Sequence, residues 1–447
     1  MLNLWCQNQT SSSGLDGNFM KKLITSAGVA AFGVSGLQAR DAPGFTPSQT
    51  ERPWTVSSTI RAFYDDNYTT SPQGLPASQA FGFEVRPAVR LALPLGQTFI
   101  GTGYNFSGRY FDGRQPDQWD YSHEFDVRLD HRFSERFELN VIDSFVISSE
   151  PTVLDSFSGI ITAPTRATGG SQRNAAKVEF SAQLTRLLGL VLGYGNNLYS
   201  YEQTGIGSRS ALLDRMEHAA NLDVRFQVTS QFVGIVGCQY GVSKYSGDTP
   251  LYMVGTFPGP YTEGPLSSIR DSQSHYGYVG AEYSFSSKLT GAIRVGIQST
   301  AYDSFSNSSL SPYVDLSMAY AYKAGCSMQA GFKHSRNSTE IAAPVGAGNV
   351  GQPTLDQETS AVFGSITHQI TRSLTGSLIS QYQMSTFNGG AANNDDENLW
   401  LVGLNFEYRI NPHLAVELGY NYDTLESALA NRSYSRNRVY IGVRATY

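Results

Sequence analysis

Apolar and polar side chains alternate along most of the chain, from about residue 54 to its end. In residues 119–133 the odd positions are mostly aromatic or aliphatic, and the even positions between them are mostly charged. Residues 438–447 repeat the pattern, with Val439 and Ile441 on one face and Arg438 and Arg444 on the other. Successive side chains of a strand point to opposite faces, so this period predicts strands whose two faces meet different surroundings.

The connections between the predicted strands form two sets that alternate in length. The short set falls near residues 94–96, 134–135, 188–189, 230, 286–287, 324–325, 372 and 411–412. The longer, polar set falls at 67–78, 112–118, 150–172, 204–213, 246–269, 305–308, 342–354, 388–396 and 426–433. The interleaving predicts about eighteen strands with both ends of the barrel region on the short-turn side, which is the asymmetry of outer-membrane barrels.

We therefore predict an all-β fold, a transmembrane antiparallel up-and-down β-barrel spanning 54–447, with short periplasmic turns and long outer loops. Past residue 39 no apolar run approaches 18 residues, so a membrane span has to be a closed barrel. Alternation alone leaves the inverse assignment open, in which the apolar face fills the interior. Strand length and an export signal favour lipid outside. One exception is Asp143, which falls in an apolar row and suggests a bulge, a shifted register or an outer-leaflet position.

The N-terminal region has the features of an export signal. Met20, Lys21 and Lys22 precede a modest apolar run over 23–37, and a cleavage point follows at 38–39. This predicts a signal peptide at 20–39, a mis-started upstream segment at 1–19 and an irregular periplasmic leader at 40–53. The expected location is the cell outer membrane of a Gram-negative bacterium.

Composition agrees with a strand-rich membrane protein and excludes several functions. Charged residues make up 16% of the chain, against about 25% in ordinary domains, and Tyr, Phe and Gly are abundant. The net charge of −6 gives no support for nucleic-acid binding. Cys238 and Cys326 lie in apolar rows and form no disulfide framework.

We expect no metal or cofactor site and no enzyme. The histidines lack zinc spacing, and no Gly-x-Ser-x-Gly motif occurs. A Ser-His-acid site assembled from distant residues stays open, since its members need not be neighbours in sequence.

The polar row supplies candidate pore-lining residues, because charges facing an enclosed lumen keep it wet and filter solutes. They are Arg86, Arg90, Arg109, Glu124, Asp126, Arg128, Asp130, Arg132, Asp223 and Arg225. The alternative is that these charges only pair with each other inside a plugged barrel.

Two loops with apolar content unusual for water-facing segments are candidates for a constriction, or alternatively for rim packing or an oligomer contact. Their candidate residues are Leu154 and Phe157 in 150–172, and Tyr252, Phe257 and Tyr261 in 246–269.

The architecture and the alternating ending that stops on Tyr447 resemble Gram-negative outer-membrane porins. The resemblance implies passive diffusion of small hydrophilic solutes or ions through a lipid-embedded barrel. It also implies recognition of Tyr447 by the barrel assembly machinery, and it leaves a homo-oligomer open. Two alternatives remain, namely a barrel for polysaccharide or protein export and a plugged surface-binding barrel.

Overall fold

The fold is described from a computed structural model that covers residues 53–149, 153–154, 161–166, 169–255, 259–306, 308–342 and 352–447. The predicted upstream segment, the signal peptide and nearly all of the leader lie outside these residues and stay predictions. Within the described ranges, no helix is long and apolar enough to cross a membrane.

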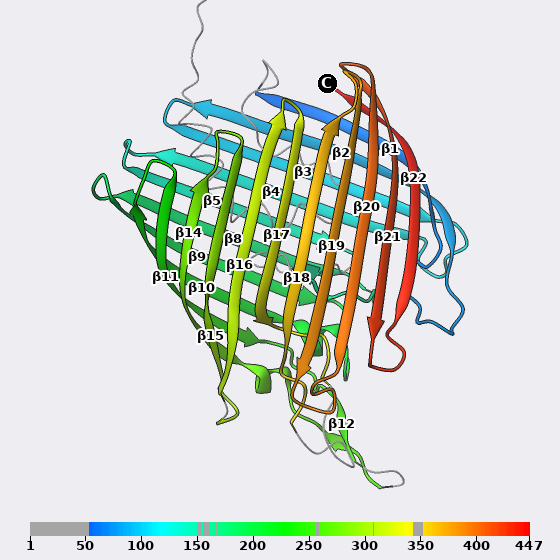
Figure 1. Cartoon of the computed structure of the whole chain (residues 1–447). Helices are drawn as coiled ribbons and strands as arrows, with labels where there is room; N and C mark the ends of the chain where they lie inside the picture. The colour runs from blue at the N-terminus through cyan, green and yellow to red at the C-terminus, as the bar shows by residue number, and fades with distance from the viewer. Residues whose placement is uncertain are drawn as a thin grey trace, which may run out of the picture.

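Eighteen antiparallel strands form one sheet that closes on itself (Figure 1). Each strand pairs with the next along the chain, and β1 pairs with both β2 and β22, which closes the ring. The strands are β1 (Trp54–Asp65), β2 (Ala80–Leu95), β3 (Thr98–Phe111), β4 (Trp119–Arg132), β5 (Phe137–Ser148), β8 (Ser171–Gln183), β9 (Leu188–Tyr201), β10 (Arg215–Gln227), β11 (Phe232–Tyr245), β14 (Ser272–Ser284), β15 (Leu289–Tyr302), β16 (Ser308–Lys323), β17 (Cys326–Asn337), β18 (Asp356–Gln369), β19 (Leu374–Asn388), β20 (Asp396–Asn411), β21 (Leu414–Ser427) and β22 (Tyr434–Thr446). The predicted fold class is confirmed.

Short elements occupy the longer connections. They are β6 (Val153–Leu154), β7 (Ile161–Ala163), α2 (Arg209–Leu213), β12 (Met253–Val254), β13 (Thr262–Glu263) and the 3₁₀ turn η1 (Ser267–Arg270). The alternation of short and long connections follows the prediction. The turn placed at 188–189 is at 184–187, because Leu188 and Gly189 already pair within β9, and the turn placed at 94–96 begins at 96, because Pro94 and Leu95 pair within β2.

The outward face of the barrel is apolar and the inward face is polar. On β22, Val439, Ile441 and Val443 are exposed, whereas Tyr440 and Arg436, which lie in the alternate row, are buried. The inverse assignment, with apolar side chains inside, is therefore wrong. A ring of strands with an apolar outer surface satisfies its backbone internally and can sit in hydrocarbon.

Asp143 points outward in a regular register. It pairs with Val127 on β4 and Ala176 on β8, and no register shift interrupts either ladder. The suggested bulge is therefore wrong. Its carboxylate Oδ1 accepts a hydrogen bond of 2.9 Å from the side-chain amide of Asn174 on β8.

Candidate pore and constriction

Charges of alternating sign occupy one register row of the inner wall. Arg61 on β1 pairs with Glu84 on β2, Glu84 with Arg109 on β3, and Arg109 with Asp120 on β4. The Glu84 carboxylate is 3.2 Å from Arg109 Nε and 3.6 Å from Arg61 Nη1. Opposite charges that face each other across strands stabilise a sheet, and here they also fix the side chains against the wall.

A glycine lets this row continue across the seam where the chain closes. Gly442 on β22 lies between Arg61 and Glu417 of β21, and a Cβ there would stand 2.6 Å from Arg61 Cγ. Because the position is empty, the Arg61 guanidinium passes over it and donates to Glu417. It also lies 4.4 Å from the ring centre of Tyr440.

A second polar cluster lies on the far wall, and there too a side chain lies over a glycine of the neighbouring strand. Tyr278 on β14 lies over Gly237 of β11 and donates a 2.5 Å hydrogen bond to Asp223 of β10. Arg294 on β15 is 3.5 Å from Asp223 and 3.7 Å from Glu282. The inner wall therefore carries fixed, paired charges on opposite sides of the lumen.

The connection between β5 and β8 runs inside the barrel over residues 161–166. Ile161 is buried against the inward side chains Leu399, Leu425 and Tyr434. Its backbone N–H donates to the side-chain amide of Gln383 on β19 at 3.0 Å, and its carbonyl accepts from the same amide at 2.8 Å. This end of the segment is fixed to the wall formed by β19–β22.

The other end of the segment reaches β4. The Arg166 guanidinium forms an ion pair with Asp120, and its Nη1 donates to the carbonyl of Tyr68 at 3.0 Å. The Arg166 N–H donates to the Thr70 hydroxyl at 2.8 Å. Because the contacts of residues 161–166 extend from β19 to β4, we call this stretch the inward segment.

Glu340, in the loop between β17 and β18, connects the inward segment to two other loops. Its buried carboxylate accepts from Arg432 Nη2 at 2.7 Å and from the Thr165 hydroxyl at 3.0 Å, and it pairs with Arg209 of α2. Burial acts to raise the pKa of Glu340, but the guanidinium groups of Arg209 and Arg432 outweigh it and hold the pKa below its ordinary value. The carboxylate is therefore ionised at neutral pH.

A cavity of about 190 Å³ lies between the inward segment and the wall of β1–β4 and β20–β22. Its charged lining comprises Arg61, Arg86, Arg109, Arg166, Arg436, Arg438, Asp65, Glu84, Asp120, Glu124 and Asp423. The space is large enough for several water molecules.

The structure places the ten predicted pore-lining residues on the inward face, which they share with the buried Glu84, Asp120 and Asp223. Three of them, Arg86, Arg109 and Glu124, line the cavity. The other seven lie elsewhere on the wall: Arg90, Asp126, Arg128, Asp130 and Arg132 on β2 and β4 towards the short turns, and Asp223 and Arg225 on β10.

Of the predicted constriction residues, Phe157, Phe257 and the side chain of Leu154 lie outside the described residues. Tyr252 is half-buried and Tyr261 is exposed. They flank the β12–β13 hairpin, which extends beyond the strand ends, opposite the C-terminus, in Figure 1. The inward contacts of the first loop come instead from Ile161 and Arg166.

Several cavity residues are absent from the predicted set. Arg436 and Arg438 come from the last strand and meet β1 only because the ring closes, as in the ion pair of Arg436 with Asp65 at 2.6 Å. Arg166 lies in a loop, where strand periodicity gives no direction. For Arg438 a signal did exist, because it stands in the polar row of the last strand.

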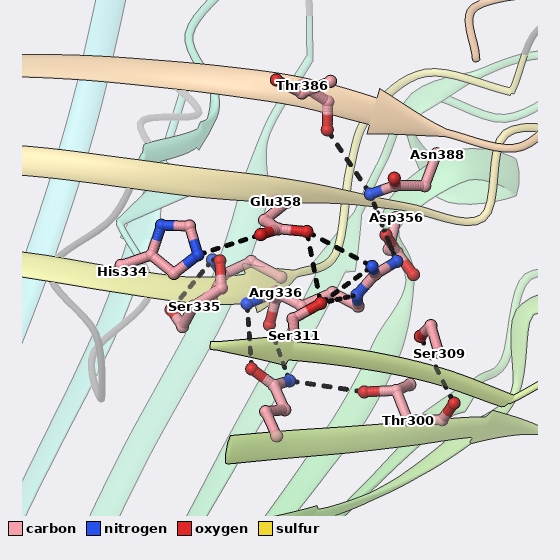
Figure 2. A network of polar contacts seen from close by, with 12 residues as sticks. Thr300, Ser309, Ser311, His334, Ser335, Arg336, Asp356, Glu358, Thr386 and Asn388 are labelled. Atoms are coloured by element: carbon pink, nitrogen blue, oxygen red, sulfur yellow. Dashed lines mark hydrogen bonds and ion pairs between the residues drawn. The ribbon is translucent and has the colours of Figure 1, made fainter. Parts of the chain in front are cut away.

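A serine, a histidine and a carboxylate do meet at the outer end of the barrel, and Figure 2 shows the histidine, His334, beside the carboxylate, Glu358. His334 on β17 is 2.8 Å from the Ser360 hydroxyl and 2.9 Å from Glu358, both on β18. The same Glu358 also accepts from Ser311 at 3.2 Å and from Arg336 at 3.4 Å. Because the carboxylate is shared with Arg336 and Ser311, we assign this network to structure.

The network supplies hydrogen bonds where the pairing of β16 with β17 stops. The β16–β17 pairing ends at Val314–His334, next to Pro312, which has no N–H to donate. The side-chain amide of Gln298 on β15 replaces the missing partner by accepting from the Arg336 N–H at 2.9 Å and donating to the Arg336 carbonyl at 3.1 Å. Arg336 in turn binds Asp356 of the neighbouring strand β18 at 2.8 Å.

No group of three or more His, Cys, Asp or Glu side chains is arranged to hold a metal ion in the part of the chain that the structure describes. A closed ring of eighteen strands, apolar outside and ionic inside, with a segment folded into the lumen, defines an outer-membrane β-barrel of the porin type.

Comparison with known proteins agrees with this class. Residues 263–447 match the family described as Putative beta-barrel porin 2. No curated protein matches the sequence.

Solved structures similar to the chain include an outer membrane protein, OccAB4 and an iron transporter. The outer membrane protein OpdK from Pseudomonas aeruginosa shares 11% identity over 88% of this chain and 99% of its own, with a TM-score of 0.43. OccAB4 from Acinetobacter baumannii shares 11% sequence identity over 90% of this chain and 100% of its own, with a TM-score of 0.42. The FrpB iron transporter from Neisseria meningitidis shares 10% sequence identity over 89% of this chain and 82% of its own, with a TM-score of 0.42.

Proposed function

We propose that the barrel is a channel for passive diffusion of small hydrophilic solutes across the outer membrane, without catalysis. The observation that carries the proposal is the cavity of about 190 Å³ between the inward segment and a charged wall. Barrels of 16 to 18 strands are wide enough for an aqueous path, and charged linings keep such a path wet.

The cellular setting belongs to the same proposal. The protein is delivered to a Gram-negative outer membrane after removal of residues 20–39, and the assembly machinery recognises Tyr447. Its outward apolar rows contact lipid, and copies of the chain associate in the membrane.

Single-channel recording tests the function directly. The full-length protein is expressed in a Gram-negative host, purified in detergent from the outer membrane and inserted into planar bilayers. We expect stable open steps in potassium chloride. A correctly folded barrel, identified by heat-modifiable migration, that stays silent would contradict free diffusion and favour the plugged or export forms.

A further inference from the structure

Three of the arginines around the cavity are more exposed than the acids with which they pair. The side chain of Arg109 is 27% exposed and that of its partner Glu84 only 6%. The same holds for Arg438 at 29% against Asp423 at 8%. Arg86, the third exposed cation, also pairs with Glu84.

The acids of the cavity lie behind this layer of cations. All five acidic residues of the lining are buried, namely Asp65, Glu84, Asp120, Glu124 and Asp423. Although positive and negative residues are nearly equal in number, a solute in the cavity meets guanidinium groups first.

The Arg438 guanidinium does not use all of its donors. It donates from Nη2 to Asp423 at 2.8 Å, and its Nε, which is buried, has no hydrogen-bond partner among the described residues. A guanidinium has five donors in a planar fork that matches a carboxylate, and hydrogen bonds between charged groups are the stronger ones. In a recess with low-dielectric walls, the field of such groups is concentrated rather than screened.

We infer that the cavity beneath the inward segment is a binding site for small organic carboxylates, held by Arg86, Arg109 and Arg438. The inference rests on the proposed channel and adds the class of its solute. The volume of about 190 Å³ suits a compact acid of a few carbon atoms. The buried acids hold the three guanidinium groups in place but do not face the ligand.

Isothermal titration calorimetry on the detergent-purified full-length protein tests the site without requiring conduction. Succinate serves as the probe, and succinamide, its uncharged diamide of similar shape, serves as the reference compound. We expect heat from succinate and none from succinamide. R86Q, R109Q and R438Q keep polar side chains, and each is expected to weaken succinate binding by about tenfold, as the loss of one charge-assisted hydrogen bond implies.

Arg225→Gln is the matched control. Arg225 is also partly exposed, at 25%, and pairs with a buried acid, Glu282, but it lies outside the cavity. We expect its variant to bind succinate like the wild type.

Succinate binding that survives the three substitutions together, or that equals succinamide binding, would overturn the inference. A wild-type barrel that conducts but binds no succinate would overturn it and leave the channel standing. Binding by a barrel that does not conduct would support the site and contradict diffusion. Heat-modifiable migration confirms that each variant has folded.

Discussion

Single side chains can replace missing backbone hydrogen bonds in this sheet, and Gln298 shows how. Pro312 interrupts the ladder next to β17, and the Gln298 amide satisfies both backbone groups of Arg336 instead. Gln298 is almost completely buried, so water has little access to these groups. The outer end of the β16–β17 seam therefore depends on one amide.

Replacement of Gln298 by Leu is expected to destabilise the barrel. The change keeps the size of the side chain but leaves the Arg336 N–H and carbonyl unpaired, at a cost of about 1–3 kcal/mol. The measurement is urea unfolding in micelles followed by tyrosine fluorescence. Unchanged stability would show that other groups satisfy the Arg336 backbone.

Asp143 poses the opposite problem, because it is an ionisable side chain in a row of apolar ones. A charge on the lipid-facing surface costs free energy that depends on depth. Asn174 offers one hydrogen bond and no opposite charge. The pair therefore lowers the stability of a barrel that is surrounded only by lipid.

The double replacement of Asp143 and Asn174 by Val is expected to stabilise the barrel by about 1 kcal/mol. Val fits a strand and removes both polar groups from hydrocarbon. The midpoint of thermal gel-shift unfolding in micelles checks this. A lower midpoint, with loss of an oligomeric band on native gels, would instead place the pair in a contact between copies.

At the scale of elements, three loops and the inward segment depend on one carboxylate. Glu340 contacts Arg209, Arg432 and Thr165, and Arg432 also binds Glu397 of β20 at 2.9 Å. These arginines stay charged at any ordinary pH, so protonation of the carboxylates that they bind, Glu340 and Glu397, is what weakens the cluster.

The pH dependence has a definite sign. Because the pKa of Glu340 is lowered from 4.5 in the folded state, its contribution is complete above pH 4.5. The contribution is lost as the pH falls through the lowered pKa. Acid is therefore expected to loosen the loops over the lumen.

Glu340→Gln is expected to reproduce the acid state at neutral pH. In single-channel recordings the wild type gains current fluctuations below pH 4.5, and the variant shows them already at pH 7. Arg409→Gln is a control, since this arginine pairs with Glu407 near the opposite end of the barrel. If Glu340→Gln and the wild type respond to acid alike, another group controls the loops.

At the scale of the whole molecule, closure joins the first and last strands. Trp54 and Tyr447 bring their rings within 5.7 Å, and Val56 and Tyr447 exchange backbone hydrogen bonds of 2.8 and 3.0 Å. Arg61 spans the seam over Gly442 to reach Glu417. The ring has no free edge, which removes the usual site of strand aggregation.

Gly442→Ala is expected to strain this seam. The added Cβ would meet Arg61 Cγ at 2.6 Å and the Ile60 carbonyl at 2.8 Å, and overpacking of this kind costs about 1–3 kcal/mol. Gly277→Ala on β14 is the matched control, because a Cβ there meets nothing within 4 Å. Thermal gel shifts compare the two variants, and equal midpoints would contradict the role of Gly442.

The sequence predicted the barrel because strand periodicity is a local property. Val439 and Arg438 lie on opposite faces of their strand whichever strands pair with it. Polar loops mark the ends of strands irrespective of where those strands lie in space. The order of the connections then required neighbouring strands to pair. Of the alternatives for Asp143, the bulge and the shifted register were wrong, since an outward charge breaks the pattern without breaking the ladder.

The sequence by itself determined which side chains share a face of each strand, because a two-residue period needs no knowledge of distant segments. Only the tertiary structure decided where the charges converge. Arg438 meets Asp65 and Arg86 shares a cavity with Arg166 because the ring closes and a loop folds inward. Such contacts join residues hundreds of positions apart, and no local pattern specifies them.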